Sequence, residues 1–159
     1  MLRVGIWEGE EAILPAVGAW ADRLGVELLA GRHPGELAGR PLDLLVVVPG
    51  SAGWAGAGAV DCQTALLPGT AGPLARMLRP PQAVSYGTSP RDSLTFSSLE
   101  GGRLSLAIQR ELVTPAGVVV ERQELLLPFS PGRSPLPFLA AAGTLLLMGI
   151  PPEELAGAL

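Results

Sequence analysis

Three short segments of the chain follow apolar runs, share a turn pattern and carry hydroxyl groups. Val46–Gly53 (VVVPGSAG) and Ala65–Gly72 (ALLPGTAG) have nearly the same sequence motif, and Val84–Pro90 (VSYGTSP) is a looser third version. If the strands before them are parallel, these turns lie at the sheet edge where open α/β sheets bind ligands. Glycine admits a ligand close to the backbone, while hydroxyl and guanidinium groups supply donors. The candidate ligand-binding residues are therefore Gly50, Ser51, Gly69, Thr70, Tyr86, Gly87, Thr88, Ser89, Arg91 and Asp92.

The same turns also fit a purely structural role, because Pro, Gly and Ser are the residues with which chains turn. A small hydrolase is the enzymatic alternative, with a hydroxyl of one of these turns as its nucleophile. Such a hydroxyl must be activated by a base, and the sequence offers only His33, the single histidine, or a carboxylate. No catalytic residue is assigned on this basis.

Several kinds of chemistry are excluded by residues that the chain lacks. All eleven cations are arginine, a composition typical of a GC-rich genome, so neither a Schiff-base lysine nor the lysine of a P-loop is present. Cys62 is the only cysteine, which excludes an internal disulfide and a zinc site of the CxxC kind. Glu8, Glu10 and Glu11 are interpreted as the acidic opening of a helix. We expect no metal site and no cofactor.

The composition predicts an ordered domain with large buried areas. Of the 159 residues, 48% are hydrophobic and only 16% are charged, and the net charge is −4. The arginines are scattered among carboxylates without the basic stripe that a nucleic-acid partner requires. The longest apolar helix candidate, Pro137–Met148, is too short to span a bilayer, and the chain opens on a predicted strand rather than a signal peptide. We expect a cytoplasmic protein with a small-molecule or protein partner, a homo-oligomer being a further option.

The hydrophobic patterns predict a mostly parallel sheet flanked by helices in the first half of the chain. Short apolar runs of this kind are typical of strands buried on both faces, whereas helical spacing of apolar residues predicts amphipathic helices. The predicted strands are Leu2–Ile6, Val26–Ala30, Leu42–Val48, Gln63–Leu67 and Ala83–Tyr86, and the predicted helices are Glu10–Leu24 and Thr70–Leu78, the latter capped by Thr70.

The second half predicts a three-stranded antiparallel meander and then a buried helix. Apolar and polar residues alternate from Leu94 and again from Leu104, and the third strand is expected over Val118–Leu127. The helix capped by Ser134 is apolar all round and ends at Gly149, so it should lie in the core. The fold class is therefore a Rossmann-like α/β domain, spanning residues 1–159, with a meander and a buried C-terminal helix.

From about Gln63 onward, these features resemble the back half of the central domain of Mur ligases. Those ATP-dependent enzymes of the peptidoglycan pathway join amino acids to a UDP-sugar precursor. The likeness rests on AVSYG (Ala83–Gly87), where the family has a similar strand and turn, on the meander, and on the closing segment LLLPFSPGRSPLPFLAAAGTLLLMGIPPEELAGAL.

The opening segment departs from that family. Its central domain begins with a P-loop ending in Gly-Lys-Thr/Ser, whereas VGIWEGEEAILPAVGAW has no lysine and carries acids that would repel phosphates. Where the family places a His-Asn pair, this chain has Arg133 and Ser134. The resemblance thus implies a degenerate domain that is no ligase by the family's mechanism. We expect a non-catalytic domain that binds a small ligand, an anion included, or a protein partner at the carboxyl ends of its parallel strands.

Overall fold

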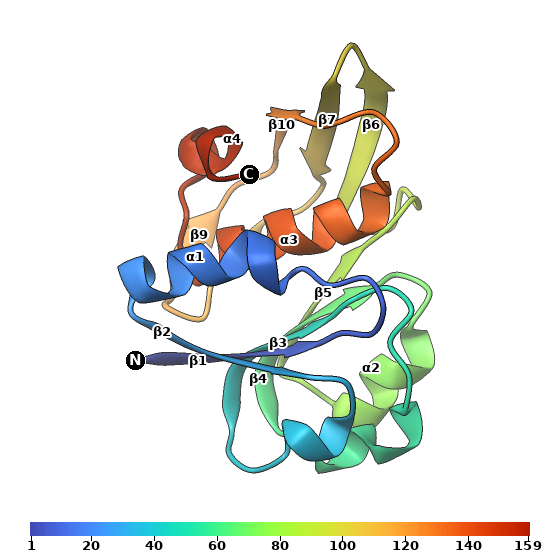
Figure 1. Ribbon diagram of the computed structural model, residues 1–159, viewed down its shortest axis with the longest axis vertical. Coiled ribbons are helices and arrows are strands. Elements are labelled where there is room, and N and C mark those ends of the chain that lie inside the picture. The colour runs from blue at the N-terminus through green and yellow to red at the C-terminus, as the bar shows by residue number, and fades with distance from the viewer.

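A mixed eight-stranded sheet forms the centre of the molecule, seen in a computed structural model that describes all 159 residues (Figure 1). Its strand order is β10-β7-β6-β5-β4-β3-β1-β2, and β1 to β5 pair with their neighbours in parallel. The strands are β1 (Leu2–Trp7), β2 (Val26–Gly31), β3 (Leu42–Val47), β4 (Cys62–Pro68), β5 (Gln82–Tyr86), β6 (Leu94–Glu100), β7 (Arg103–Ile108) and β10 (Gln123–Pro128). The mostly parallel α/β sheet predicted from the sequence is confirmed.

Helical segments cover both faces of this sheet. One face carries α1 (Leu14–Leu24), α3 (Pro135–Met148) and α4 (Leu155–Ala158), and the other carries α2 (Gly72–Leu78) (Figure 1). Three short 3₁₀ segments complete the set: η1 (Pro34–Glu36), η2 (Trp54–Ala59) and η3 (Pro152–Glu154). Side chains alternate along β1, so Ile6 packs in the larger apolar cluster with α1 and α3, while Trp7 packs in the smaller cluster with η2 and α2.

The helix α3 lies flat on the middle of the sheet, and its side chains from Phe138 to Met148 are buried. Gly143 permits the close approach, because a Cβ there would lie 2.8 Å from Leu94 Cδ1 and 3.0 Å from Leu66 Cδ2. The prediction of a buried terminal helix ended by Gly149 is confirmed, with Gly149 at φ 114°. Ser134 occupies the N-cap position but makes no side-chain capping bond, so its predicted capping role is wrong.

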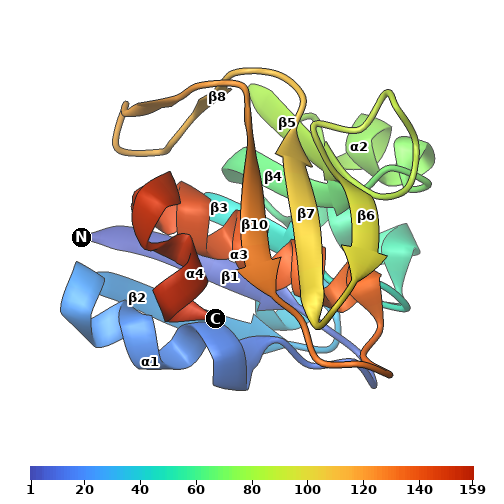
Figure 2. The same cartoon turned by 90° about the horizontal axis from the view of Figure 1, so that it is seen from above.

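The predicted meander exists and extends the parallel sheet. Figure 2 shows β6, β7 and β10 side by side, and Tyr86 of β5 pairs with Leu94 of β6. The third strand is shorter than predicted, because the segment around Thr114 forms its own two-stranded sheet of β8 (Leu112–Val113) and β9 (Val119–Val120). Thr114 closes this hairpin, since its backbone N–H donates to the Val118 carbonyl and its hydroxyl accepts the Val118 N–H.

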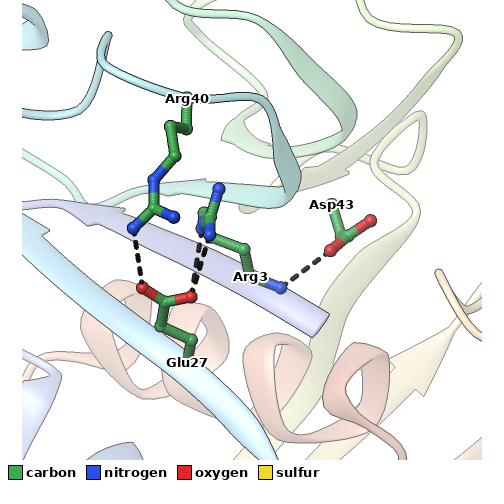
Figure 3. Close-up of polar contacts among 4 residues, drawn as sticks. All are labelled: Arg3, Glu27, Arg40 and Asp43. Carbon is green, nitrogen blue, oxygen red and sulfur yellow. Dashed lines mark hydrogen bonds and ion pairs between the residues drawn. The ribbon is translucent and has the colours of Figure 1, made fainter. Parts of the chain in front are cut away.

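A charged network ties together the amino ends of three strands (Figure 3). Glu27 accepts hydrogen bonds from Arg3 at 3.0 Å and from Arg40 at 3.3 Å. Asp43 accepts the backbone N–H of Arg3 at 2.7 Å. Arg3, Glu27 and Asp43 are the second residues of β1, β2 and β3, and Arg40 lies shortly before β3. The network therefore braces the sheet at the edge opposite the carboxyl ends of these strands.

None of the helices combines the length and the apolar character that a membrane-spanning segment requires.

Candidate functional site at the carboxyl ends of the parallel strands

The parallel strands bring the three predicted turns to one edge of the sheet. Gly50, Gly69 and Gly87 directly or closely follow β3, β4 and β5, which are neighbours in the sheet. The loops after β1 and β2 reach the same edge, because these strands are parallel to β3. The edge therefore has two halves, one formed by the turns after β4 and β5 and the other by the loops after β1, β2 and β3.

The half at β4 and β5 is filled by the side chain of Asp92. Its carboxylate is buried, with 4% of the residue exposed, and accepts the Ser89 N–H at 3.0 Å. A Cβ on Gly69 would lie 2.0 Å from Asp92 Oδ1, and one on Gly87 would lie 2.5 Å from Oδ2. The two glycines thus make room for the Asp92 carboxylate, which occupies the space between the turns after β4 and β5.

The predicted hydroxyl groups are mostly engaged with the backbone. Tyr86 is buried, and its hydroxyl donates to the Val47 carbonyl at 2.5 Å. Burial, and to a lesser extent the charge of Glu11, raise the pKa of Tyr86, so this group is a poor acid or base at neutral pH. Ser51 donates to the Val48 carbonyl at 2.5 Å.

The remaining predicted residues lie on exposed parts of the same turns. The hydroxyl of Ser89 accepts the backbone N–H of Arg91 at 3.1 Å. Thr70, Thr88 and the Arg91 side chain are exposed and make no side-chain hydrogen bond. Thr70 does not cap α2 as predicted, because the helix begins at Gly72 with Ala71 in the cap position.

The other half of the edge is hollow. A cavity of about 410 Å³ opens among the loops after β1, β2 and β3. Gly50 is the one predicted site residue that lines it. The lining residues are Gly9, Glu10, Glu11, Arg32, His33, Pro49, Gly50 and Ala52. The other lining residues could have been predicted from their position in the sequence, because they follow parallel strands as the predicted turns do.

Close backbone packing fixes the shape of the cavity. A Cβ on Gly9 would lie 3.2 Å from the Gly50 carbonyl oxygen, so the loops after β1 and β3 touch directly. The indole N–H of Trp7 donates to the Ala52 carbonyl at 3.0 Å and anchors the loop after β3 from below. His33 lies against the same loop, since a Cβ on Gly53 would lie 3.5 Å from its Nδ1.

The start of α1 explains why Glu10 and Glu11 are free to face this cavity. The predicted helix over Glu10–Leu24 is too long at its beginning, because α1 starts at Leu14. The Glu8 carboxylate accepts the N–H of Ile13, the cap residue, at 2.9 Å. Pro15 in the first turn has no N–H to offer. The segment between Glu8 and Ile13 is therefore a loop held by the chain's own carboxylate.

A nucleoside triphosphate, the co-substrate of the ATP-dependent Mur ligases, does not fit these residues. Phosphates bind free N–H groups at a helix N-terminus, but at α1 the Ile13 N–H already bonds Glu8. Glu10 and Glu11 add negative charge to the cavity, and the chain has no lysine. The structure also contains no cluster of three or more His, Cys, Asp or Glu side chains that could hold a metal ion.

Known proteins resemble this chain in fold but not recognisably in sequence. No protein-family model matches it, and no curated protein does. Two crystal structures of MurF from Acinetobacter baumannii superpose with a TM-score of 0.61 at 13% identity, over 99% of this chain and 45% and 44% of theirs. The same values, with 45% of its length covered, hold for a UDP-N-acetylmuramoylalanyl-D-glutamyl-2,6-diaminopimelate--D-alanyl-D-alanyl ligase from that organism.

These comparisons establish a Mur ligase-like fold. The match covers nearly the whole chain, so the structural likeness includes β1 and α1, which the sequence resemblance left out. The chain spans less than half the length of the structures it matches.

Proposed function

We propose that this domain binds a small polar ligand in the cavity formed by the loops after β1, β2 and β3, and that it catalyses no reaction of its own. The observation that carries the proposal is the position of the cavity, which has a volume of about 410 Å³ and opens at the carboxyl ends of parallel strands, bordered by charged side chains from two loops. That volume falls within the range of roughly 300–1,000 Å³ typical of ligand pockets. The site stays at the sheet edge expected from the sequence but lies in its other half.

The composition of the lining supports binding rather than nucleophilic catalysis. No serine, threonine, tyrosine or cysteine lines the cavity. His33, the only imidazole, therefore has no hydroxyl or thiol among the lining residues to activate, as a hydrolase using this cavity would require. The hydroxyls of Ser51 and Tyr86, named for the hydrolase alternative, donate to backbone carbonyls.

Ligand-induced stabilisation tests the proposal directly. A ligand at one hundred times its Kd stabilises a protein by about 2.7 kcal/mol, which corresponds to roughly 5–10 °C in Tm for a chain of this size. We would measure melting temperatures with amino acids, carboxylic acids, nucleotides and sugar nucleotides, and confirm any response by calorimetric titration.

A pair of matched variants locates the binding site. Ala52 lines the cavity and is exposed, so Ala52→Phe should fill the mouth and abolish binding. Ala55 is also exposed in the same segment but does not line the cavity, and Ala55→Phe should bind normally. Equal binding by both variants, or no response to any compound, would refute the proposal.

A protein partner at the carboxyl ends of the same strands and a homo-oligomer both remain predictions. Light scattering at micromolar concentration would test the second, since a strictly monomeric chain would exclude an assembly role.

A further inference from the structure

We infer that the ligand of this cavity is a small zwitterion, with its ammonium group facing Glu10 and Glu11 and its carboxylate facing Arg32 and His33. This inference rests on the proposed function and names the chemical class of the ligand. It follows from the placement of charge around the cavity.

The acidic and basic side chains come from loops that lead to opposite faces of the sheet. Glu10 and Glu11 immediately precede the segment that starts α1, which covers one face. Arg32 and His33 immediately precede η1, which packs with η2 on the other face. Because β1 and β2 are adjacent, the cavity at their ends is bordered by carboxylates on one side and by cationic or hydrogen-bonding groups on the other.

These opposite charges do not neutralise each other. The protein's only ion pairs within 4.0 Å join Glu27 to Arg3 and Arg40 at the other edge of the sheet. The nitrogens of Arg32 and His33 therefore lie more than 4.0 Å from the carboxylate oxygens of the acidic side. A molecule carrying both charges can bridge that gap, and Coulomb attraction then acts at both of its ends.

The neighbouring carboxylate, Glu8, is not available for this role. It accepts the Ile13 N–H at 2.9 Å and so belongs to the cap of α1. Glu10 and Glu11, in contrast, accept no side-chain hydrogen bond and form no ion pair within the chain. Their carboxylates are therefore available to a ligand in the cavity that they line.

The same arrangement disfavours ligands with two like charges. A dicarboxylate would place one of its groups against Glu10 and Glu11, and a diamine would place one against Arg32. An uncharged diol would gain neither attraction. Each exposed ion pair contributes up to about 1 kcal/mol, which is about fivefold in affinity. We therefore expect the zwitterion to bind more tightly than the dicarboxylate, the diamine or the diol, by up to about fivefold for each attraction that the other probe lacks.

Four straight-chain probes of equal length test this order: aminohexanoate, diaminohexane, adipate and hexanediol. The series is repeated with aminobutyrate, diaminobutane, succinate and butanediol, because the span between the charged groups differs with chain length. Calorimetric titration of the full chain at low ionic strength gives each Kd. We expect the zwitterion of at least one series to bind more tightly than its three partners.

Charge-removing variants test which side binds which group. Arg32→Gln should weaken the zwitterion about fivefold and shift the preference toward the diamine. The double substitution Glu10→Gln and Glu11→Gln should shift it toward the dicarboxylate. Glu153→Gln and Arg103→Gln, exposed positions that do not line the cavity, should change neither. A merely structural role of these residues would lower all affinities together and leave the preference unchanged.

The outcomes separate this inference from the proposed function. Tightest binding by the dicarboxylate, diamine or diol would overturn the zwitterion while leaving a ligand site in the cavity. Uniform weakening of all four probes by Arg32→Gln and by the double variant would also overturn it. Absence of binding by every probe and by the wider panel would overturn both proposals.

Discussion

The glycines at the ends of β4 and β5 provide a sharp test of how the sheet edge is built. Gly69→Ala places a methyl group 2.0 Å from Asp92 Oδ1. Neither partner yields easily, because the Gly69 N–H donates to the Tyr86 carbonyl at 2.8 Å and the Asp92 carboxylate holds the Ser89 N–H. Overpacking of this kind costs about 1–3 kcal/mol.

The backbone conformation makes the sign of this effect informative. Gly69 does not have a positive φ, so without the clash alanine would stabilise by about 0.4–1 kcal/mol through the unfolded state. The two contributions together predict a net loss of up to about 2.5 kcal/mol, or roughly up to 10 °C in Tm. In an Asp92→Ala background the clash is gone, and the same substitution should become neutral or stabilising.

Urea unfolding of the four proteins of this double-mutant cycle measures the coupling, which should be about 1–3 kcal/mol. Gly58→Ala serves as the matched control, since Gly58 has no positive φ and no atom within 4 Å of an added Cβ. It should be neutral or slightly stabilising in both backgrounds. If Gly69→Ala costs the same free energy with and without Asp92, the carboxylate does not fill that half of the edge.

Three further perturbations follow from single contacts. Tyr86→Phe removes the donor to the Val47 carbonyl and should cost about 1–2 kcal/mol in urea unfolding. Because the pKa of Tyr86 is raised in the folded state, the stabilisation from this group is present below about pH 10 and is lost above it. The free energy of unfolding should therefore fall more steeply above about pH 10 in the native chain than in the variant. Burial, with a smaller contribution from Asp61, raises the pKa of Cys62 to about 11, so a thiol reagent at pH 8 should label the folded protein far more slowly than the urea-unfolded one, and equal rates would show that the thiol is accessible. Glu8→Ala should cost about 0.5–2 kcal/mol by uncapping the Ile13 N–H, whereas Glu10→Ala should leave the free energy of unfolding nearly unchanged. Similar losses in both variants would show that Glu8 does not cap α1.

The sequence predicted the elements whose signals are local. The continuous apolar run of β3 and the all-apolar α3 are recognisable because they are buried on every side, and that burial imposes an unbroken pattern. Gly25 and Gly149 mark helix ends through positive φ values of 65° and 114°, which glycine adopts without steric cost. The parallel order of β1 to β5 then placed all the candidate turns at one edge.

The open half of that edge was not predictable in the same way. Whether a turn leaves a cavity depends on which later side chain enters it, and Asp92 reaches Gly69 from twenty-three positions farther along the chain. The acidic residues after β1 predict the first turn of a helix, because helix starts favour acidic residues. Only the bond from Ile13 to Glu8 shows that the helix begins later and that Glu10 and Glu11 remain in a loop.

Carboxylates of the chain itself occupy space and backbone donors in both halves of the edge. At β4 and β5 the chain supplies its own carboxylate, Asp92, to the space between two glycines and to a turn N–H. At α1 it supplies Glu8 to the donor that an external anion would otherwise use. In the other half the chain leaves Glu10, Glu11 and Arg32 without an ion-pair partner beside the cavity. Because these side chains carry charges of both signs, the zwitterion that we propose is the ligand class that they attract at both of its ends.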